Sequence, residues 1–266
     1  MDLQLENRHA LISGGSKGIG LACARGFLEE GARVSLVSRD PANLEAARQS
    51  LLDTFSDAGD RIVVCHADLT DAAAAADAIE QAESRHGPVD MLVNSAGGAK
   101  RTPPEELTPQ HWHDAMQAKY FTYIHLIDPM IKRMGARGCG VIINIVGAGG
   151  KVASPIHLPG GAANAALMLV SAGLAAAYGP KGVRVNAINP GITLTERMKE
   201  GLDADARLNG VTPAEALERS SARIPLGRIA QPEEIANAVL FLCSPRASYI
   251  TGAILTMDGG LAPMVV

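Results

Sequence analysis

Glycine residues cluster directly after the first strand-like run of the chain, in the stretch SGGSKGIG that begins at Ser13. Gly14 permits a sharp turn from strand to helix, and Gly18 and Gly20 let the backbone approach a bound pyrophosphate closely. The stretch that follows has a helical pattern, so its first N–H groups and the positive end of its dipole would face that anion. The order of strand, turn and helix favours a dinucleotide-binding loop over a glycine-rich turn that binds nothing.

Such a loop needs a sheet to hold it, and seven short aliphatic runs are the candidate strands. They are HALIS (9–13), RVSLV (33–37), RIVVC (61–65), VDMLV (89–93), GVIINIV (140–146), VRVNAI (183–188) and AILTM (253–257). Several runs are apolar at consecutive positions and helical patterns separate them, which is typical of parallel strands covered by helices on both faces. We therefore expect an α/β fold, a doubly wound parallel sheet of the Rossmann type, in one domain spanning residues 1–266. The polar, glycine-containing stretch 192–230 is expected to be a mobile flap over the site.

Composition and charge narrow the classes of function. The chain has 266 residues and a formal net charge of -4, so no basic stripe for nucleic acid is expected. No run approaches the roughly 18 apolar residues of a membrane span, and the first residues lack a signal-peptide pattern. The four cysteines form no C-x-x-C pair and are expected to be buried thiols. These features predict a cytoplasmic protein that acts on a small molecule and holds no metal.

Four motifs together resemble the short-chain dehydrogenase/reductase family. They are Ser13-Gly14-x-x-x-Gly18-x-Gly20, the NSAG from Asn94 to Gly97, the RVNAINPG from Arg184 to Gly191, and the YITGAILTMDGG near the end of the chain. The resemblance spans nearly the full chain. It implies that Asp68 holds the adenine, that Asn94, Ala96 and Gly97 line the cofactor, and that the segment from Pro190 to Thr195 meets the nicotinamide end. The cofactor-binding residues expected on this basis are Gly14, Ser16, Lys17, Gly18, Ile19, Gly20, Ser38, Arg39, Asp68, Leu69, Asn94, Ala96, Gly97, Pro190, Gly191, Ile192 and Thr195.

The residues after the second strand predict which dinucleotide binds. An acidic residue there would accept a hydrogen bond from the ribose 2′-OH, whereas arginine would pair with a 2′-phosphate. This chain has Ser38 and Arg39, and Lys17 would add a second cation if the loop folds as in the family. We therefore predict NADP(H), with NAD(H) as the other cofactor to consider. The alternative is that Arg39 is a solvated surface charge.

The catalytic set of the family is Asn, Ser, Tyr and Lys, with Tyr and Lys spaced Y-x-x-x-K. That spacing places the ammonium beside the phenol and lowers a Tyr pKa of about 10 toward the working pH. Registered on GVIINIV and NAAL, the equivalent positions hold Gly147 for Ser, Gly160 for Tyr and Asn164 for Lys, and counting from Trp112 puts Lys119 in place of Asn. The four tyrosines, Tyr120, Tyr123, Tyr178 and Tyr249, have no lysine four residues later. The usual proton donor is therefore expected to be absent.

Three residues are predicted to take over the chemistry. His157 is the first candidate for the proton donor, because its ordinary pKa near 6.5 suits proton transfer. Lys119 and Asn164 would keep one cation and one amide near the nicotinamide ribose. Tyr123 and Lys151 are later candidates for the donor. The alternatives are a surface role for His157, a helix-surface charge for Lys119, and packing for Tyr123; a cavity about the size of a phenol is expected beside Gly160.

The sequence is compatible with three functions. The first is an NADP(H)-dependent oxidoreductase that acts on a small carbonyl, alcohol or activated alkene with a non-standard proton donor. The second is a cofactor-binding pseudoenzyme without catalysis, and the third is a lyase or isomerase that reuses the pocket. The intact segment NPGITLT at the nicotinamide end favours the first. The resemblance also implies a homodimer or homotetramer, formed through helices at about 109–135 and 159–179.

Overall fold

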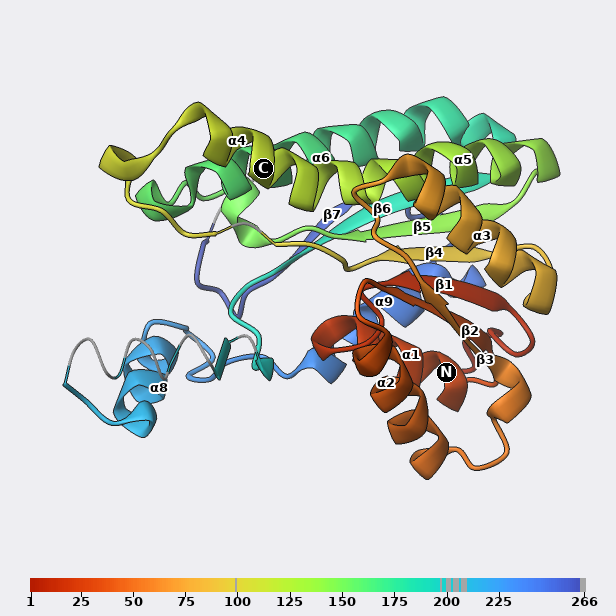
Figure 1. Cartoon of the computed structure of the whole chain (residues 1–266), viewed down its shortest axis with the longest axis horizontal. Helices are drawn as coiled ribbons and strands as arrows, with labels where there is room; N and C mark the ends of the chain where they lie inside the picture. Colours follow the sequence, from red (N-terminus) through yellow and green to blue (C-terminus); the bar gives the residue numbers. More distant parts are fainter. Residues whose placement is uncertain (99, 197, 200–201, 203–205, 207–209, 264–266) are drawn as a thin grey trace.

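Seven parallel strands form one sheet within the described part of the chain, and helices cover both of its faces (Figure 1). The computed structural model describes every residue except 99, 197, 200–201, 203–205, 207–209 and 264–266. The strand order is β3-β2-β1-β4-β5-β6-β7, so the winding direction reverses between β1 and β4. Ligands of doubly wound sheets bind at such a reversal, outside the carboxyl ends of the strands.

The bounds of the elements follow the sequence prediction closely. The strands are β1 (His9–Ser13), β2 (Arg33–Ser38), β3 (Ile62–His66), β4 (Met91–Asn94), β5 (Gly140–Ile145), β6 (Val183–Pro190) and β7 (Ile254–Met257). The helices are α1 (Gly18–Glu29), α2 (Pro41–Thr54), α3 (Ala72–His86), α4 (Pro109–Ala115), α5 (Thr122–Arg137), α6 (Leu158–Tyr178), α8 (Pro213–Ala222) and α9 (Pro232–Cys243). Each predicted strand is present, so the prediction of an α/β doubly wound sheet is confirmed.

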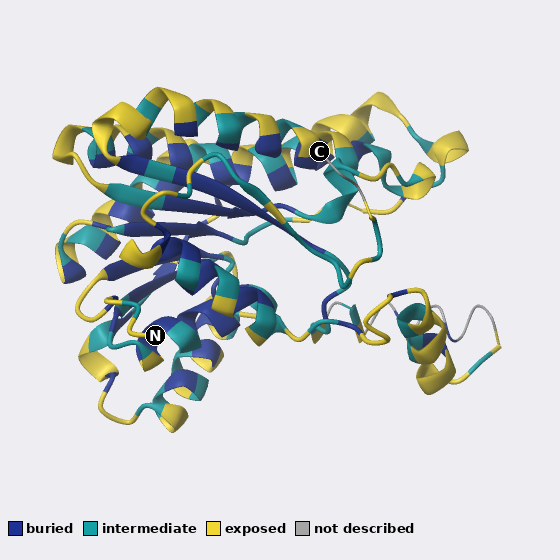
Figure 2. Ribbon diagram, turned by 180° about the vertical axis from the view of Figure 1, so that it is seen from behind, coloured by how far each residue is buried: buried dark blue, intermediate teal, exposed yellow. Residues whose placement is uncertain are grey.

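Two apolar cores lie on opposite faces of the sheet (Figure 2). Within β1, Ala10 and Ile12 belong to the core under α1, α2 and α9, whereas Leu11 belongs to the core under α3, α5 and α6. This alternation follows from the strand geometry, in which successive side chains point to opposite faces. Because both faces are covered, the strands read as continuous apolar runs.

Between α4 and α5 the chain makes a π-helical turn, Met116–Phe121, which the sequence did not predict. Such turns insert one extra residue into a helix and are frequent at functional sites. Lys119 lies in this turn and is only 8% exposed. The alternative that Lys119 is a helix-surface charge is therefore wrong.

The long helix α6 corrects one expectation drawn from composition. With its flanking turns it spans Pro155–Lys181, and these 27 residues are long and apolar enough to cross a membrane by length and composition. The helix nevertheless lies along the sheet, where Leu167, Met168 and Ala175 belong to the core. Packing on the sheet accounts for the apolar residues on this inner face, whereas Leu169 on the outer face is 76% exposed.

The segment 192–230 leaves the sheet after β6, and its helix α8 stands to one side of the main body (Figure 1). Its described residues Leu202, Ala206 and Ala216 form a small apolar cluster of their own. The two ends of the segment are joined by the Leu194 N–H, which donates to the carbonyl oxygen of Ala230 at 2.8 Å. The Leu226 N–H donates to the carbonyl oxygen of Gly259, after β7, at 3.2 Å. The segment thus returns to the carboxyl edge of the sheet.

Candidate cofactor and catalytic site

The glycine loop turns from β1 into α1 at the carboxyl edge of the sheet, beside β4. Gly14 has φ +66°, and a side chain at this position would lie 2.9 Å from the backbone of Ala96. A side chain on Gly20 would overlap the carbonyl oxygen of Gly14. Among the described residues no side chain caps α1 and its first turn carries no acid, so its N–H groups face this edge. The loop therefore has the shape and the donors that a phosphate requires.

The residues predicted to meet the adenosine ribose lie together at the ends of β2 and β3. The hydroxyl of Ser16 donates to Ser38 Oγ at 3.0 Å, which joins the glycine loop to β2. Asp68 accepts from the N–H and the hydroxyl of Thr70 at 3.0 and 2.8 Å. These bonds, with the nearby Arg39 guanidinium, hold the pKa of Asp68 below its ordinary value. A cation and a carboxylate thus share the edge that would contact the adenosine.

A buried chain of hydrogen bonds supports the loop from below. Ser13 Oγ donates to Asn94 Oδ1 at 3.3 Å, Asn94 Nδ2 donates to Asn144 Oδ1 at 2.9 Å, and Asn144 Nδ2 donates to Ser171 Oγ at 2.9 Å. The Ala96 N–H donates to Ser13 Oγ at 3.3 Å. Asn94 is fully buried, so its side chain holds β1 against β4.

The segment after β6 returns to the glycine loop. The methyl group of Thr195 lies 3.1 Å from the position that a side chain on Gly18 would take. Lys17 Nζ lies 3.6 Å from the carboxylate of Glu196, with both side chains exposed. Of the other predicted residues, Ile19 lies in the first turn of α1, and Leu69 lies in the apolar core after β3. Gly97 follows β4. Pro190 is the last residue of β6, and Gly191 comes directly after it. Apart from Ile19, these residues lie at or just after the carboxyl ends of strands.

Lys119 is the buried cation of the site. Its Nζ donates to the hydroxyl of Tyr123 at 2.9 Å and to the carbonyl oxygen of Ile145 at 3.2 Å. The Tyr123 hydroxyl itself donates to Ile145 at 2.6 Å, and this side chain is fully buried. Tyr123 therefore positions Lys119 against the end of β5. Its role thus includes these hydrogen bonds as well as the packing given as the alternative for Tyr123.

His157 and Asn164 meet at the glycine-rich turn after β5. A side chain on Gly149 would lie 3.1 Å from His157 Cδ2 and 3.6 Å from Asn164 Nδ2. A side chain on Gly147 would lie 3.2 Å from the same Asn164 nitrogen. Within the described structure, His157 Nδ1 and Asn164 Oδ1 are buried and have no hydrogen-bond partner. Because both atoms are enclosed, a ligand can reach them only after neighbouring groups move.

The pKa of His157 is lowered from its ordinary value. Burial is the largest cause, and the charges of Arg101 and Lys119 add to it. The imidazole is therefore neutral at pH 7 in this form of the protein. The sequence alone had suggested a pKa near 6.5 for this residue, because neither cation is its neighbour in the chain.

The comparisons with known proteins agree with this geometry. A family model described as enoyl-(acyl carrier protein) reductase matches residues 14–262. L-sorbose reductase from Gluconobacter frateurii, solved with NADPH and L-sorbose, is 32% identical with a TM-score of 0.93, and 100% of each chain is covered. Gluconate 5-dehydrogenase from Gluconobacter oxydans is 33% identical over 257 residues, 97% of this chain and 95% of its own. The chain belongs to the short-chain dehydrogenase/reductase family.

A further solved family member is also similar to this chain. It is an NADPH-bound short chain oxidoreductase from Pseudomonas aeruginosa, described as containing an atypical catalytic center. It is 31% identical, with a TM-score of 0.89 and 97% of this chain and 98% of that chain covered. The names of these short-chain dehydrogenases and reductases agree with the oxidoreductase class expected from the sequence.

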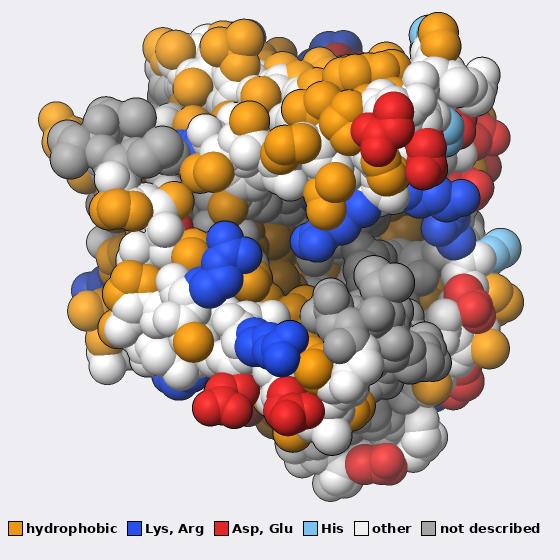
Figure 3. Space-filling model, turned by 90° about the vertical axis from the view of Figure 1, so that its left-hand side faces the viewer, with side chains coloured by type: hydrophobic (Ala, Val, Ile, Leu, Met, Phe, Trp, Pro, Cys, Tyr) orange, Lys and Arg blue, Asp and Glu red, His pale blue; other side chains and the backbone are white. Residues whose placement is uncertain are grey.

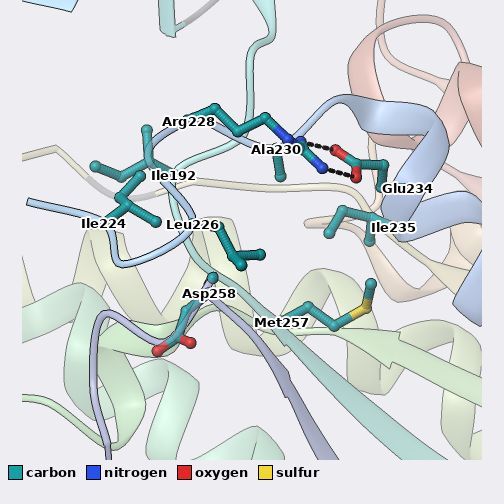
Figure 4. A pocket seen from close by; sticks show the side chains of 10 residues that line it. Ile192, Ile224, Leu226, Arg228, Ala230, Glu234, Ile235, Met257 and Asp258 are labelled. Carbon is teal, nitrogen blue, oxygen red and sulfur yellow. Dashed lines mark hydrogen bonds and ion pairs between the residues drawn. The ribbon is translucent and has the colours of Figure 1, made fainter. Parts of the chain in front are cut away.

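A cavity of about 180 Å³ lies beside the predicted site (Figure 4). Its walls are mainly apolar, and Arg228 closes one side through two bonds of 2.6 Å to the carboxylate of Glu234. Ile192 is the one residue of the predicted short-chain dehydrogenase site that lines it. Neither this cavity nor a second one of about 170 Å³ at the opposite edge is lined by Gly160. The cavity expected at Gly160 stays a prediction.

Sequence reasoning missed Arg101 at this site. The Thr102 N–H donates to the carbonyl oxygen of Ile156 at 2.9 Å, which brings the loop after β4 beside the turn that carries His157. In Figure 3, which faces this edge of the molecule, Lys and Arg side chains border a central hollow and the acidic side chains lie farther from it. Arg101 belongs to no motif, so only a count of basic residues in the loop after β4 could have suggested it.

Proposed function

We propose that this chain is an NADP(H)-dependent oxidoreductase that reduces a small carbonyl compound or activated alkene, or oxidises the corresponding alcohol. The observation that carries the proposal is the cradle at the turn from β1 into α1, where a side chain on Gly14 or Gly20 would collide with backbone. The relatives solved with NADPH support the same cofactor. Arg39 and Lys17 would bind the 2′-phosphate, since both are exposed cations at the end of the loop where that group would lie.

We propose that the usual Ser, Tyr and Lys of the family are replaced by Gly147, Gly160 and Asn164. Gly147 has φ +126°, a backbone conformation that strongly favours glycine. Serine at this position would be strained and would crowd the Asn164 amide. The backbone at the end of β5 thus has a form suited to glycine, which supports this proposal.

Asn164 and Lys119 would bind the nicotinamide ribose of the dinucleotide. When bound, the dinucleotide supplies or accepts the hydride. Asn164 Oδ1, a buried acceptor without a partner in the described structure, would accept a hydrogen bond from a ribose hydroxyl. Lys119, held by Tyr123 and Ile145, would supply the positive charge beneath that ribose.

His157 would hold the proton for the carbonyl oxygen at Nδ1, the atom that lacks a partner among the described residues. As a neutral tautomer the imidazole donates a hydrogen bond through this N–H and so stabilises negative charge on that oxygen. Burial and the charges of Arg101 and Lys119 disfavour the protonated imidazole, so a ligand anion that offsets these charges would favour full proton transfer. The enclosed turn at Gly147–Gly150 would exclude water from this step.

A panel of ketones, aldehydes and enones tests the proposal, with NADPH consumption as the readout. We expect turnover by the unaltered chain, and a loss of about 10²- to 10⁴-fold in His157→Ala with unchanged affinity for NADPH. His113→Ala, which removes an exposed histidine from α4, is the matched control. Tight NADPH binding without turnover on any compound would instead support the pseudoenzyme. Conversion of a compound without net NADPH consumption would support a lyase or isomerase.

We also propose that the chain forms a homodimer or homotetramer in the cytoplasm. The outer face of α6 presents small and apolar side chains in a continuous stripe, Ala162, Ala165, Leu169, Gly173 and Ala176, which are all exposed. Small residues allow two helices to approach closely, so a second copy could cover this stripe. A monomer in sedimentation at micromolar concentration would contradict this proposal.

The segment 192–230 would act as a flap of the single domain in this proposal. Its contacts with the glycine loop run through Thr195 and the pair of Lys17 and Glu196. An exposed ion pair contributes little to stability, about 0 to 1 kcal/mol, so a bound 2′-phosphate could replace the carboxylate on Lys17. We expect bound NADPH to slow proteolysis within 192–230.

A further inference from the structure

We propose that the substrate carries an anionic group, a carboxylate or a phosphate, which Arg101 binds at the mouth of the site while the reacting carbonyl lies beside His157. The inference rests on the proposed function and names the substrate class for the same site. Three observations support it: the position of Arg101, the lack of a carboxylate partner for Arg101 among the described residues, and the two basic groups that act on His157.

The position of Arg101 is fixed by the backbone next to it. The bond of 2.9 Å from the Thr102 N–H to the carbonyl oxygen of Ile156 joins the loop after β4 to the turn that carries His157. Arg101 therefore lies one residue from a backbone contact whose other partner precedes His157. A molecule that contacts His157 therefore comes close to this guanidinium, whose charge acts on the imidazole.

Arg101 is available for an anion. Its side chain is exposed, and in the described ranges it forms no ion pair with a carboxylate, although Glu105 and Glu106 follow within a few residues. Elsewhere on the surface, exposed arginines such as Arg228 do pair with an acid, here Glu234. A guanidinium presents a fork of donors that matches a carboxylate or a phosphate.

Besides burial, which is the largest cause of the lowered pKa of His157, the charged groups around it in the described part of the chain are basic. The charged groups that act on the imidazole are Arg101 and Lys119, and both lower its pKa. Neither belongs to the set that would hold the dinucleotide phosphates, which lies at the ends of β1 and β2. An anionic group on the substrate would offset these two cations and favour the protonated imidazole. The anionic group of the substrate would therefore both strengthen binding to Arg101 and favour the protonated form of His157.

Matched pairs of carbonyl compounds test this inference. Levulinate and its methyl ester differ by a carboxylate, and dihydroxyacetone phosphate and dihydroxyacetone differ by a phosphate. Equilibrium binding to the complex of the protein with NADP⁺ and the rate of NADPH consumption are both measured for each pair. We expect the anionic member of at least one pair to bind about tenfold or more tightly, because a charge-assisted hydrogen bond is worth that much.

Two variants assign the effect to Arg101. Arg101→Gln is expected to remove the preference for the anion and leave the affinity for NADPH unchanged. Lys100→Gln removes the neighbouring exposed charge and is expected to keep the preference. The phosphate pair and the carboxylate pair together decide which anion the site takes.

Four results would overturn the inference or separate it from the proposed function. Equal binding of both members in both pairs would overturn it, as would an unchanged preference in Arg101→Gln. A loss of NADPH affinity in Arg101→Gln would show that this residue binds the cofactor instead. If anionic members bind more tightly and no member consumes NADPH, the anion site stands and the proposed oxidoreductase function fails.

Discussion

Replacing Arg39 with glutamine tests how the chain selects its dinucleotide. Arg39 is exposed and follows β2, and its carbonyl oxygen accepts a hydrogen bond from His66 Nε2 at 2.9 Å. Because this bond uses the backbone, the loop keeps its shape when the side chain changes. The variant therefore removes a guanidinium and little else.

The magnitude follows from that exposure. A hydrogen bond to a charged group contributes about 1.5 to 3 kcal/mol, and solvent at an exposed site reduces this to about 1 to 2 kcal/mol. Each 1.4 kcal/mol is about a tenfold change in Kd, so the affinity for NADPH should fall about 5- to 30-fold. The affinity for NADH should not change, because NADH has no 2′-phosphate.

Titration of nucleotide fluorescence gives both dissociation constants. Arg48→Gln is the matched control, since Arg48 is a cation of α2 whose carboxylate partner, Glu45, lies on the same helix. Its affinities for NADPH and NADH should equal those of the unaltered chain. Selection of NADPH by Arg39 would be contradicted if the unaltered chain binds NADH at least as tightly as NADPH. It would also be contradicted if Arg39→Gln weakens the binding of both nucleotides equally.

Three further predictions concern the stability of the structure. Burial lowers the pKa of His9 to about 4 from its ordinary value of 6.5, so between these pH values the unfolded chain binds a proton that the folded chain does not. Urea unfolding should show the full contribution of His9 above about pH 6.5 and a loss of about 3 kcal/mol as the pH falls from 6.5 to 4, whereas a flat profile would contradict this burial. Gly97→Ala should lower stability by about 2 to 4 kcal/mol, because Gly97 has φ +97° and the new methyl group would overlap the carbonyl oxygen of Ala118. Gly87→Ala, at φ +76° in open space, should cost only about 1 to 2 kcal/mol, and equal costs in thermal unfolding would show that the overlap is relieved. Tyr123→Phe removes the hydroxyl between Lys119 and Ile145 and should lower the free energy of unfolding by about 1 to 3 kcal/mol, a change that an unaltered urea midpoint would refute.

The fold could be read from the sequence because its signals are local. Consecutive apolar residues in β1 predicted a strand covered on both faces, and the structure divides Ala10, Leu11 and Ile12 between two cores. Asp71, which stands just before the helical pattern of α3, also caps that helix, since its carboxylate accepts from the Ala73 N–H at 2.8 Å. Patterns of this kind depend on neighbouring residues, and the sequence contains them directly.

The electrostatics of the site could not be predicted in the same way. The spacing of Lys119 and Tyr123 placed them on one helix face, but their burial depends on the carbonyl oxygen of Ile145 at the end of β5. The π-helical turn around Lys119 has no simple sequence signal. The lowered pKa of His157 likewise depends first on burial and then on the charge of Arg101, whose loop is joined to the turn of His157 by a backbone contact. Contacts between distant segments decide these properties.

Transfer of a deuterium label tests the central claim most directly. NADPH deuterated at the nicotinamide C4 is incubated with the unaltered protein and a carbonyl compound that it consumes, and the product is analysed by mass spectrometry and NMR. The account predicts one deuterium on the former carbonyl carbon, with the hydroxyl proton drawn from solvent. Product without deuterium from either face of the labelled nicotinamide, or NADPH that stays bound and unchanged with every compound, would contradict it.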